Sequence, residues 1–394
     1  MGIARHGQNR LDAALAVYLS LLARQPRPAC FEDALLQYGL ASLELGLGRH
    51  WLALLDRLLP GGEADLSPRL LYTRGLARLA LGDYAGGWAD YEHRFAAGCS
   101  QVPDLSQPLP LWQGETPPVG SHLLLLGEQG YGDILQVLRF APLLRNRFAQ
   151  VSLLVPAPLR RLARASGLFD AVVGSADPRP TGVSHALPLL SIPHLLQLHH
   201  PALFRPEPYL APEPEAAGLW RRRLQQGPGQ RPSPPLLAIH WQGNREGESP
   251  LSSHRERSLA LADLAALPRL RRARLISVQV GPAASALRGS ALEAALVPAQ
   301  AQFDAERADF HTSAAVLAAC DLLITNDTAV AHLGGALGLP TWLLLKCHPS
   351  WQWGDQGASN PWYRSLRSFR QHRPFDWSGV LGELDQALAS VLGE

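Results

Sequence analysis

The sequence predicts two successive α/β units, each built on a parallel β-sheet, preceded by an all-α segment. Short apolar runs alternate with helical stretches, which is typical of buried parallel strands: HLLLL, VSLLV and AVVG come first, and LLAIHW, LISVQ, DLLIT and TWLLL follow. Proline-rich stretches separate these blocks. We therefore expect a helical domain at 1–100, a linker at 101–119, a first α/β domain at 120–230 and a second at 231–394.

The first 100 residues show a repeat. Amphipathic stretches each follow a turn, and the turns at Gly48 and Gly82 lie 34 residues apart. This interval is the period of tetratricopeptide repeats, in which pairs of helices stack. The interval from Asn9 to Gly48 is 39 residues, and the prolines near position 27 can absorb the excess. The pattern favours a tetratricopeptide-repeat domain, which would offer a surface to a protein partner, over a general helical bundle.

The composition excludes several classes of protein. The chain of 394 residues is 46% hydrophobic and 18% charged, which allows real cores and argues against general disorder. A net charge of +2 gives no sign of nucleic-acid binding, and no apolar stretch is long enough to span a membrane. The four cysteines lack metal-binding spacing, and the N-terminus lacks a signal-peptide core. We expect a cytoplasmic protein without a metal, with peripheral attachment to the inner membrane as an alternative.

A glycine-rich loop, GEQGYGD, directly follows the predicted strand HLLLL. Its backbone can approach a ligand closely because it contains several glycines, and the next helix begins near Asp133. Asp133 has two candidate roles: it either caps the helix or points into a cleft as a general base. The loop does not match the dinucleotide-binding pattern. The residues expected to line the cleft beside it are Glu128, Gln129, Gly130, Tyr131 and Gly132.

A second loop follows the predicted strand DLLIT and opens another helix. Amide donors, a hydroxyl and an imidazole gather at this helix start, and such a set can hold a pyrophosphate. The alternative is an ordinary strand–helix crossover with a well-capped helix and a histidine used for packing. The candidate donor-binding residues here are Asn326, Asp327, Thr328, Ala329 and His332.

Further candidates lie at other strand ends. A polar loop of about 16 residues follows LLAIHW, and loops of that length are often functional. Its arginines could neutralise phosphates, although a solvated loop is the alternative. The donor-side candidates in these loops are Asn244, Arg255, Arg257, Ser258 and Gln279. After TWLLL, Trp351 and Trp353 either wall a sugar site or pack in the core.

Five motifs in this order resemble one family. They are WxGE at 112–115, EQGxGD at 128–133, WxGN at 241–244, RxRS at 255–258 and NDTAxAHL at 326–333. Together they resemble bacterial tetratricopeptide-repeat proteins with a glycosyltransferase family 9-like region, a family that includes the ADP-heptose–lipopolysaccharide heptosyltransferases. The similarity extends over nearly the whole chain. It implies the GT-B fold, with two Rossmann-like domains, inversion at the anomeric carbon and no metal requirement.

The resemblance also implies roles for individual residues. The family's catalytic aspartate falls on Asp133, and its donor-binding motif falls on Asp327, Thr328 and His332. The chain departs from the family where heptosyltransferases have a phosphate-binding lysine, since only Arg255 or Arg257 can fill that role here. The single lysine of the chain, Lys346, has no assigned role.

The expected function is that of an inverting hexosyl- or heptosyltransferase, which moves a sugar from a nucleotide-diphosphate sugar to a glycan, lipopolysaccharide-like or protein hydroxyl. This hypothesis requires Asp133 to face the helix start near Thr328 across a shared, open gap. Two alternatives remain: a non-catalytic repeat scaffold with a degenerate transferase region, and a protein O-glycosyltransferase. An isomerase of the epimerase type is a third.

Overall fold

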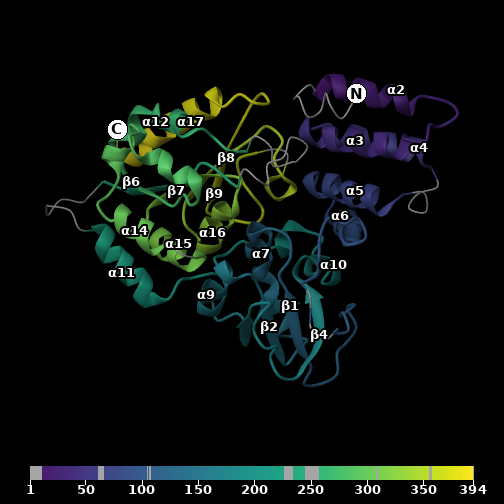
Figure 1. Cartoon of the computed structure of the whole chain (residues 1–394), viewed down its shortest axis with the longest axis horizontal. Helices are drawn as coiled ribbons and strands as arrows, with labels where there is room; N and C mark the ends of the chain where they lie inside the picture. Colours follow the sequence, from purple (N-terminus) through teal and green to yellow (C-terminus); the bar gives the residue numbers. More distant parts are fainter. Residues whose placement is uncertain are drawn as a thin grey trace.

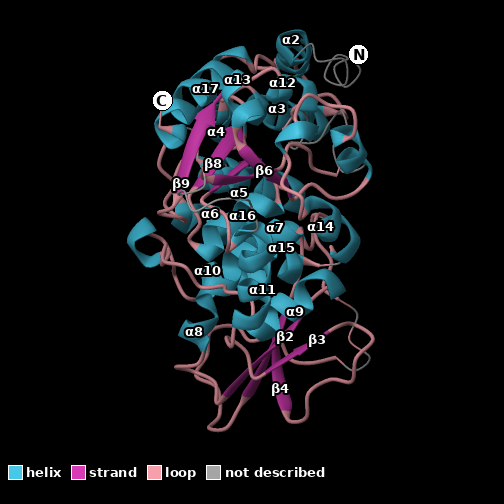
Figure 2. Cartoon of the chain, turned by 90° about the vertical axis from the view of Figure 1, so that its left-hand side faces the viewer, coloured by secondary structure: helices cyan, strands magenta, loops and turns pink. Residues whose placement is uncertain are grey.

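The chain folds into a helical segment and two α/β units. The computed structural model describes residues 11–60, 66–103, 105, 108–225, 234–244, 257–307, 309–354 and 357–393. The helical segment lies beside both units (Figure 1). The two sheets lie at opposite ends of the molecule, with helices from both units between them (Figure 2). The described residues include no helix with the length and apolarity that crossing a bilayer requires.

Most of the helical segment packs around its own core, whereas its buried Trp88 and Tyr91 belong to the core of the α/β units. Its helices are α2 (Leu11–Leu22), α3 (Phe31–Glu44), α4 (Gly48–Leu58), α5 (Pro68–Ala80) and α6 (Tyr84–Tyr91). Helices α3 and α4 approach closely because Gly39 has no side chain: a Cβ there would lie 2.4 Å from the Trp51 ring. Gly48 is the first residue of α4 and Gly82 lies just before α6, whereas the tetratricopeptide assignment stays a prediction.

The first α/β unit contains a four-stranded parallel sheet with the order β3-β2-β1-β4. Every side chain of β1 is buried, as its leucine-rich sequence predicts for a central strand. The strands are β1 (His122–Leu126), β2 (Gln150–Leu154), β3 (Ala171–Val173) and β4 (Val183–Pro188). The helices are α7 (Tyr131–Val137), α8 (Ala141–Leu144), α9 (Ala157–Ala165) and α10 (Ile192–Leu195).

The second unit contains a five-stranded parallel sheet with the order β6-β5-β7-β8-β9. Its strands are β5 (Leu236–Ile239), β6 (Arg274–Ser277), β7 (Leu322–Asn326), β8 (Thr341–Leu345) and β9 (Leu366–Arg370). Its helices are α12 (Leu261–Ala265), α13 (Pro268–Arg272), α14 (Gln300–Glu306), α15 (Phe310–Leu317), α16 (Ala329–Leu337) and α17 (Ser378–Leu392).

Helix α11 (Pro214–Gln225) packs on the second unit, although the predicted boundary at 230 assigns it to the first. It lies against α15, and the Trp220 and Phe303 rings meet with centroids 6.0 Å apart. The proline-rich composition after 205 predicts the end of the first unit, but it does not show that a helix within the stretch turns its apolar face to the following unit.

A buried ion pair joins the helical segment to the first unit. Arg94, directly after α6, donates to both carboxylate oxygens of Glu128 at 2.6 and 3.0 Å, and both side chains are fully buried. Ser100 donates a further hydrogen bond to Glu128 at 2.7 Å. Because a buried charge is costly without its partner, this pair couples the position of the helical segment to the loop after β1.

Replacing Glu128 with glutamine should therefore lower the free energy of unfolding by about 2 kcal/mol or more, since the buried Arg94 loses its buried partner and keeps the partly exposed Glu92. Urea denaturation followed by circular dichroism measures the change. Glu207 is a matched control, because it pairs with Arg364 at the surface, where both side chains are more than half exposed. Glu207→Gln should change stability by less than about 1 kcal/mol. Equal losses in the two variants would contradict the prediction.

Candidate functional site

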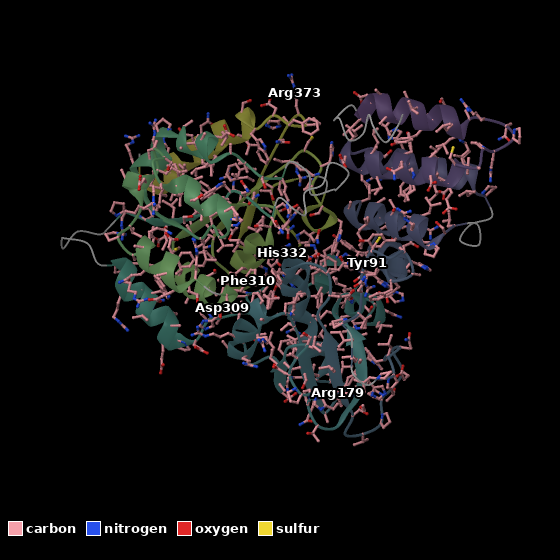
Figure 3. The ribbon with its side chains drawn as sticks, in the orientation of Figure 1. Tyr91, Arg179, Asp309, Phe310, His332 and Arg373 are labelled. Atoms are coloured by element: carbon pink, nitrogen blue, oxygen red, sulfur yellow. The ribbon has the colours of Figure 1, made fainter. Side chains whose placement is uncertain are left out.

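The starts of two helices meet where the α/β units touch. Helix α7 follows β1 and helix α16 follows β7, and their first turns pack directly together. A Cβ at Gly132 would lie 2.7 Å from Cδ2 of His332 and 3.4 Å from Cα of Ala329. Figure 3 labels His332 at this meeting point. Position 132 therefore needs a glycine because the opposite helix occupies the space of a side chain.

Asp133 uses its two carboxylate oxygens differently. Oδ2 accepts the backbone N–H of Gly130 at 3.1 Å, which caps α7. Oδ1 accepts a hydrogen bond from Nε2 of Gln352, in the second unit, at 2.7 Å. Burial raises the pKa of Asp133 to about 6, and the nearby charge of Asp327 adds to the rise. The two roles considered from the sequence thus do not exclude each other, because the residue caps its helix and also faces the other unit.

Asp327 lies on the opposite side of the same meeting point and is buried. Its carboxylate accepts hydrogen bonds from Nε1 of Trp353 at 2.7 Å and from Oγ of Ser350 at 3.0 Å. The N-cap of α16, Thr328, has an extended backbone, and its side chain makes no capping hydrogen bond. Ala329 is partly exposed. The first backbone amides of a helix have no partner within the helix, and such amides can receive an anion.

His332, a donor-binding candidate in the sequence, is packed among aromatic rings. It is buried, its Nδ1 lies 2.9 Å from the Tyr363 hydroxyl, and its ring lies on Trp353 with centroids 4.5 Å apart. Burial lowers the pKa of His332 to about 3, despite the opposing effect of Asp327. The imidazole is therefore neutral near pH 7, because the packed rings exclude the water that would stabilise its charge.

Several predicted donor-side residues hold the loops that surround the site. Asn326 is buried and donates to the backbone carbonyl of Arg257 at 2.9 Å. Gln279 accepts the backbone N–H groups of Trp241 and Gln242 at 3.1 and 3.0 Å, and Ser258 accepts that of Gly243 at 3.1 Å. These side chains fix the chain after β5, so their amides and hydroxyls are already used within the protein.

The remaining donor-side candidates lie at the ends of one loop. Asn244 is exposed and Arg257 is partly exposed, and each makes interactions in the described part of the chain. Arg255 lies outside the described residues. Of the two arginines expected to contact phosphate, Arg257 is therefore the one whose position the structure describes.

The cleft residues of the first loop separate into two groups. Gln129, Gly130 and Tyr131 are exposed, and Tyr131 contacts Phe310 with ring centroids 5.4 Å apart. Glu128, in contrast, does not line a cleft, because its carboxylate is buried against Arg94. Only the outer part of the predicted loop can contact a ligand in this arrangement.

Trp351 and Trp353 do not form an exposed wall for a sugar. Both are buried in the short 3₁₀ helix η9 (Trp351–Trp353). Trp351 packs on Trp88 and Tyr91 of α6, with centroids 5.1 and 6.3 Å away. The rings fill the space where the three parts of the chain meet, which favours the packing role.

The expected gap is therefore occupied by side chains. Asp133 and the start of α16 lie close together, and the side chains of Gln352 and Trp353 donate hydrogen bonds to Asp133 and Asp327 at this point. Sequence reasoning did not identify Gln352, since a glutamine between two tryptophans has no recognised signal. It also missed Tyr72 and Tyr91, whose raised pKa values arise mainly from burial and partly from the charge of Asp133.

No family model matches the chain. Protein FlbA from Caulobacter vibrioides is 25% identical over 366 residues, an alignment that covers 84% of this chain and 56% of FlbA. The chain thus spans little more than half the length of that curated relative.

Two solved structures are similar. A glycosyl transferase family 9 protein from Veillonella parvula has a TM-score of 0.48 and 12% identity, over 71% of this chain and 98% of its own. The E. coli ADP-heptose lipopolysaccharide heptosyltransferase II has a TM-score of 0.46 and 15% identity, over 68% of this chain and 99% of its own. Both TM-scores lie below 0.5, so the fold assignment rests on the sheets and their order.

The raised pKa of Asp133 predicts a pH-dependent change in stability for Asp133→Asn. From its ordinary value of 3.8 up to about 6, the folded state holds a proton that the unfolded state has lost. The stability of the native protein should therefore fall as pH rises through this window, by at most about 3 kcal/mol. The asparagine variant avoids this cost, so its stability relative to the native protein should rise between pH 4 and pH 8.

Urea denaturation at pH 4 and pH 8 measures this difference. Asp177→Asn is the control, because Asp177 lies at the surface and its pKa is lowered, mainly by the backbone N–H of Gly174. A stability difference between the Asp133 variant and the native protein that is independent of pH would contradict the assigned rise in pKa.

Proposed function

We propose that this chain is an inverting, metal-independent glycosyltransferase, which moves a sugar from a nucleotide-diphosphate sugar to a hydroxyl acceptor on a glycan or a protein. The observation that supports this most directly is the position of Asp133. Its carboxylate is partly buried between two parallel-sheet units, beside the start of a helix suited to an anion. The five sequence motifs and their order support the same class of reaction.

Asp133 would act as the general base. This role requires the acceptor to enter beside Gln352 and Trp353, because these side chains occupy the gap that the hypothesis from the sequence expected to be open. A carboxyl group with a pKa of about 6 is mostly ionised at pH 7.5 and is a stronger base than an ordinary aspartate. The carboxylate has about four acceptor sites, and the bonds from the N–H groups of Gly130 and of Asp133 itself and from Gln352 use three of them. The acceptor oxygen would attack the anomeric carbon while its proton moves to Asp133, and the bond from that carbon to the diphosphate would break. A single displacement of this kind inverts the anomeric centre.

The departing diphosphate would be stabilised by the backbone at the start of α16 and by Arg257. Negative charge grows on the leaving group during the reaction, and helix N-termini and arginine side chains interact favourably with such charge. His332 would contribute as a neutral group that positions Trp353 and Tyr363, because its low pKa leaves it uncharged. Asn326, Gln279 and Ser258 would support the donor loops from within.

A non-catalytic scaffold is the second candidate. One observation favours it: Gln352 and Trp353 occupy the region between Asp133 and Asp327, and both carboxylates already have protein partners. As a scaffold, the chain would use the helical segment to bind a protein, and the α/β units would only support it.

Asp133→Asn should retain nucleotide-sugar binding and lose at least about 100-fold in turnover, since the amide cannot accept the proton. Donor consumption by the purified protein, measured with each available sugar nucleotide and a hydroxyl acceptor, tests this. Asp177→Asn is again the control and should keep its activity. Turnover that persists in Asp133→Asn would remove Asp133 from the base role.

Nucleotide binding separates the transferase from the scaffold. ADP, UDP, GDP and CDP, with their sugars, are added while thermal unfolding is followed. A ligand present at about 100 times its dissociation constant adds about 2.7 kcal/mol to stability. We expect one nucleotide to raise the melting temperature, and that rise should persist in Asp133→Asn. The absence of any rise would favour the scaffold.

A further inference from the structure

The three residues of η9 contact three different parts of the chain. Trp351 packs on α6 of the helical segment. Gln352 donates a hydrogen bond to Asp133 of the first unit at 2.7 Å. Trp353 donates to Asp327 of the second unit at 2.7 Å. One short turn therefore lies where all three parts meet.

Hydrogen bonds on both sides hold this turn in place. The Gln352 backbone carbonyl accepts a bond from Asn360 Nδ2 at 3.0 Å, and Asn360 Oδ1 accepts the backbone N–H of Trp362 at 2.9 Å. The Trp353 carbonyl accepts a bond from Arg370 at 3.3 Å. Because the backbone is fixed, the Gln352 side chain has little freedom to choose another partner.

The Gln352 amide is directed at one group. It is 7% exposed, and its Nε2 donates to Oδ1 of Asp133. Its Oε1 is buried and has no hydrogen-bond partner among the described residues. A buried amide oxygen without a partner is costly. The contact with Asp133 is thus the side-chain interaction that fixes the orientation of this glutamine.

The groups facing Asp133 show what Gln352 contributes. Asp327 precedes α16 and repels the ionised carboxylate, and His332 of α16 is neutral. Tyr72 of α5 and Tyr91 of α6 also lie within reach of its charge, and both hydroxyls stay protonated at neutral pH. The donors that stabilise the charged form are the backbone N–H groups of Gly130 and of Asp133 itself and the Gln352 amide. Only Gln352 comes from the opposite unit.

We propose that Gln352 is a positioning residue that holds the Asp133 carboxylate across the boundary between the two units and maintains its ionised form. Its catalytic meaning rests on the proposed function, but the contact can be measured without turnover. A neutral amide suits this task, because it donates a hydrogen bond without adding a charge beside Asp327. A carboxylate at the same position would instead repel Asp133.

The test measures the titration of Asp133 in the full chain. The protein is labelled with carbon-13 aspartate, and the Asp133 carboxyl resonance is assigned from its loss in Asp133→Asn. In Gln352→Leu the midpoint should move up by about one pH unit, because a charge-assisted hydrogen bond to the ionised form is lost. In Gln352→Glu it should also rise. Gln371→Leu is the matched control, because it removes another buried glutamine, whose Oε1 accepts the Cys347 N–H, and should leave the midpoint unchanged.

Turnover gives the second readout. In Gln352→Leu the pH of half-maximal rate should move up together with the carboxyl midpoint. At pH values well below the native midpoint, the rate of the variant should therefore be about tenfold lower than the native rate. A carboxyl midpoint that stays in place in either folded Gln352 variant, or that moves equally in Gln371→Leu, overturns the inference. If the native chain turns over no donor while the midpoint still moves, the proposed function fails and the positioning contact stands.

Discussion

The direct contact between the starts of α7 and α16 is the constraint on which the arrangement of the site depends. Each helix start is the positive end of a helix dipole, and two such ends repel. Each is accompanied by an aspartate, Asp133 at α7 and Asp327 before α16, which offsets that charge. Gly132 allows the backbones to approach because it leaves room for His332. The contact between the two units therefore depends on the absence of a side chain at Gly132 and on the carboxylates of Asp133 and Asp327.

Much of the fold was predictable from apolar patterning. The runs HLLLL and TWLLL coincide with β1 and β8, and five further runs overlap β2, β3, β5, β6 and β7. The strands without a prediction, β4 and β9, each lie at the edge of a sheet. In VSHALP and LRSFR polar residues interrupt the apolar run, and several of their side chains are partly buried or exposed. Patterning detects burial, and these two strands are only partly buried.

The site was less predictable, because its contacts join distant parts of the chain. Sequence reasoning placed Asp133, Asp327 and His332 near the starts of helices that follow strands. In the structure Asp133 lies in α7, His332 lies in α16, and Asp327 directly follows β7. It could not show that His332 is neutral, since that depends on rings supplied by Trp353 and Tyr363. Nor could it identify Gln352, which lies 219 residues from its partner Asp133. The sequence gives the type of each loop residue directly, whereas the residue that it contacts depends on how distant parts of the chain fold together.

The tryptophans at the meeting of the three parts give the molecule an internal optical reporter. Trp88, Trp351, Trp353 and Trp362 are all buried there, and Trp351 contacts both Trp88 and Trp362. Indole emission shifts to longer wavelength when water reaches the ring. Any movement that separates the two sheets, or lifts the helices away from them, would thus change the intrinsic fluorescence of the protein without an added dye.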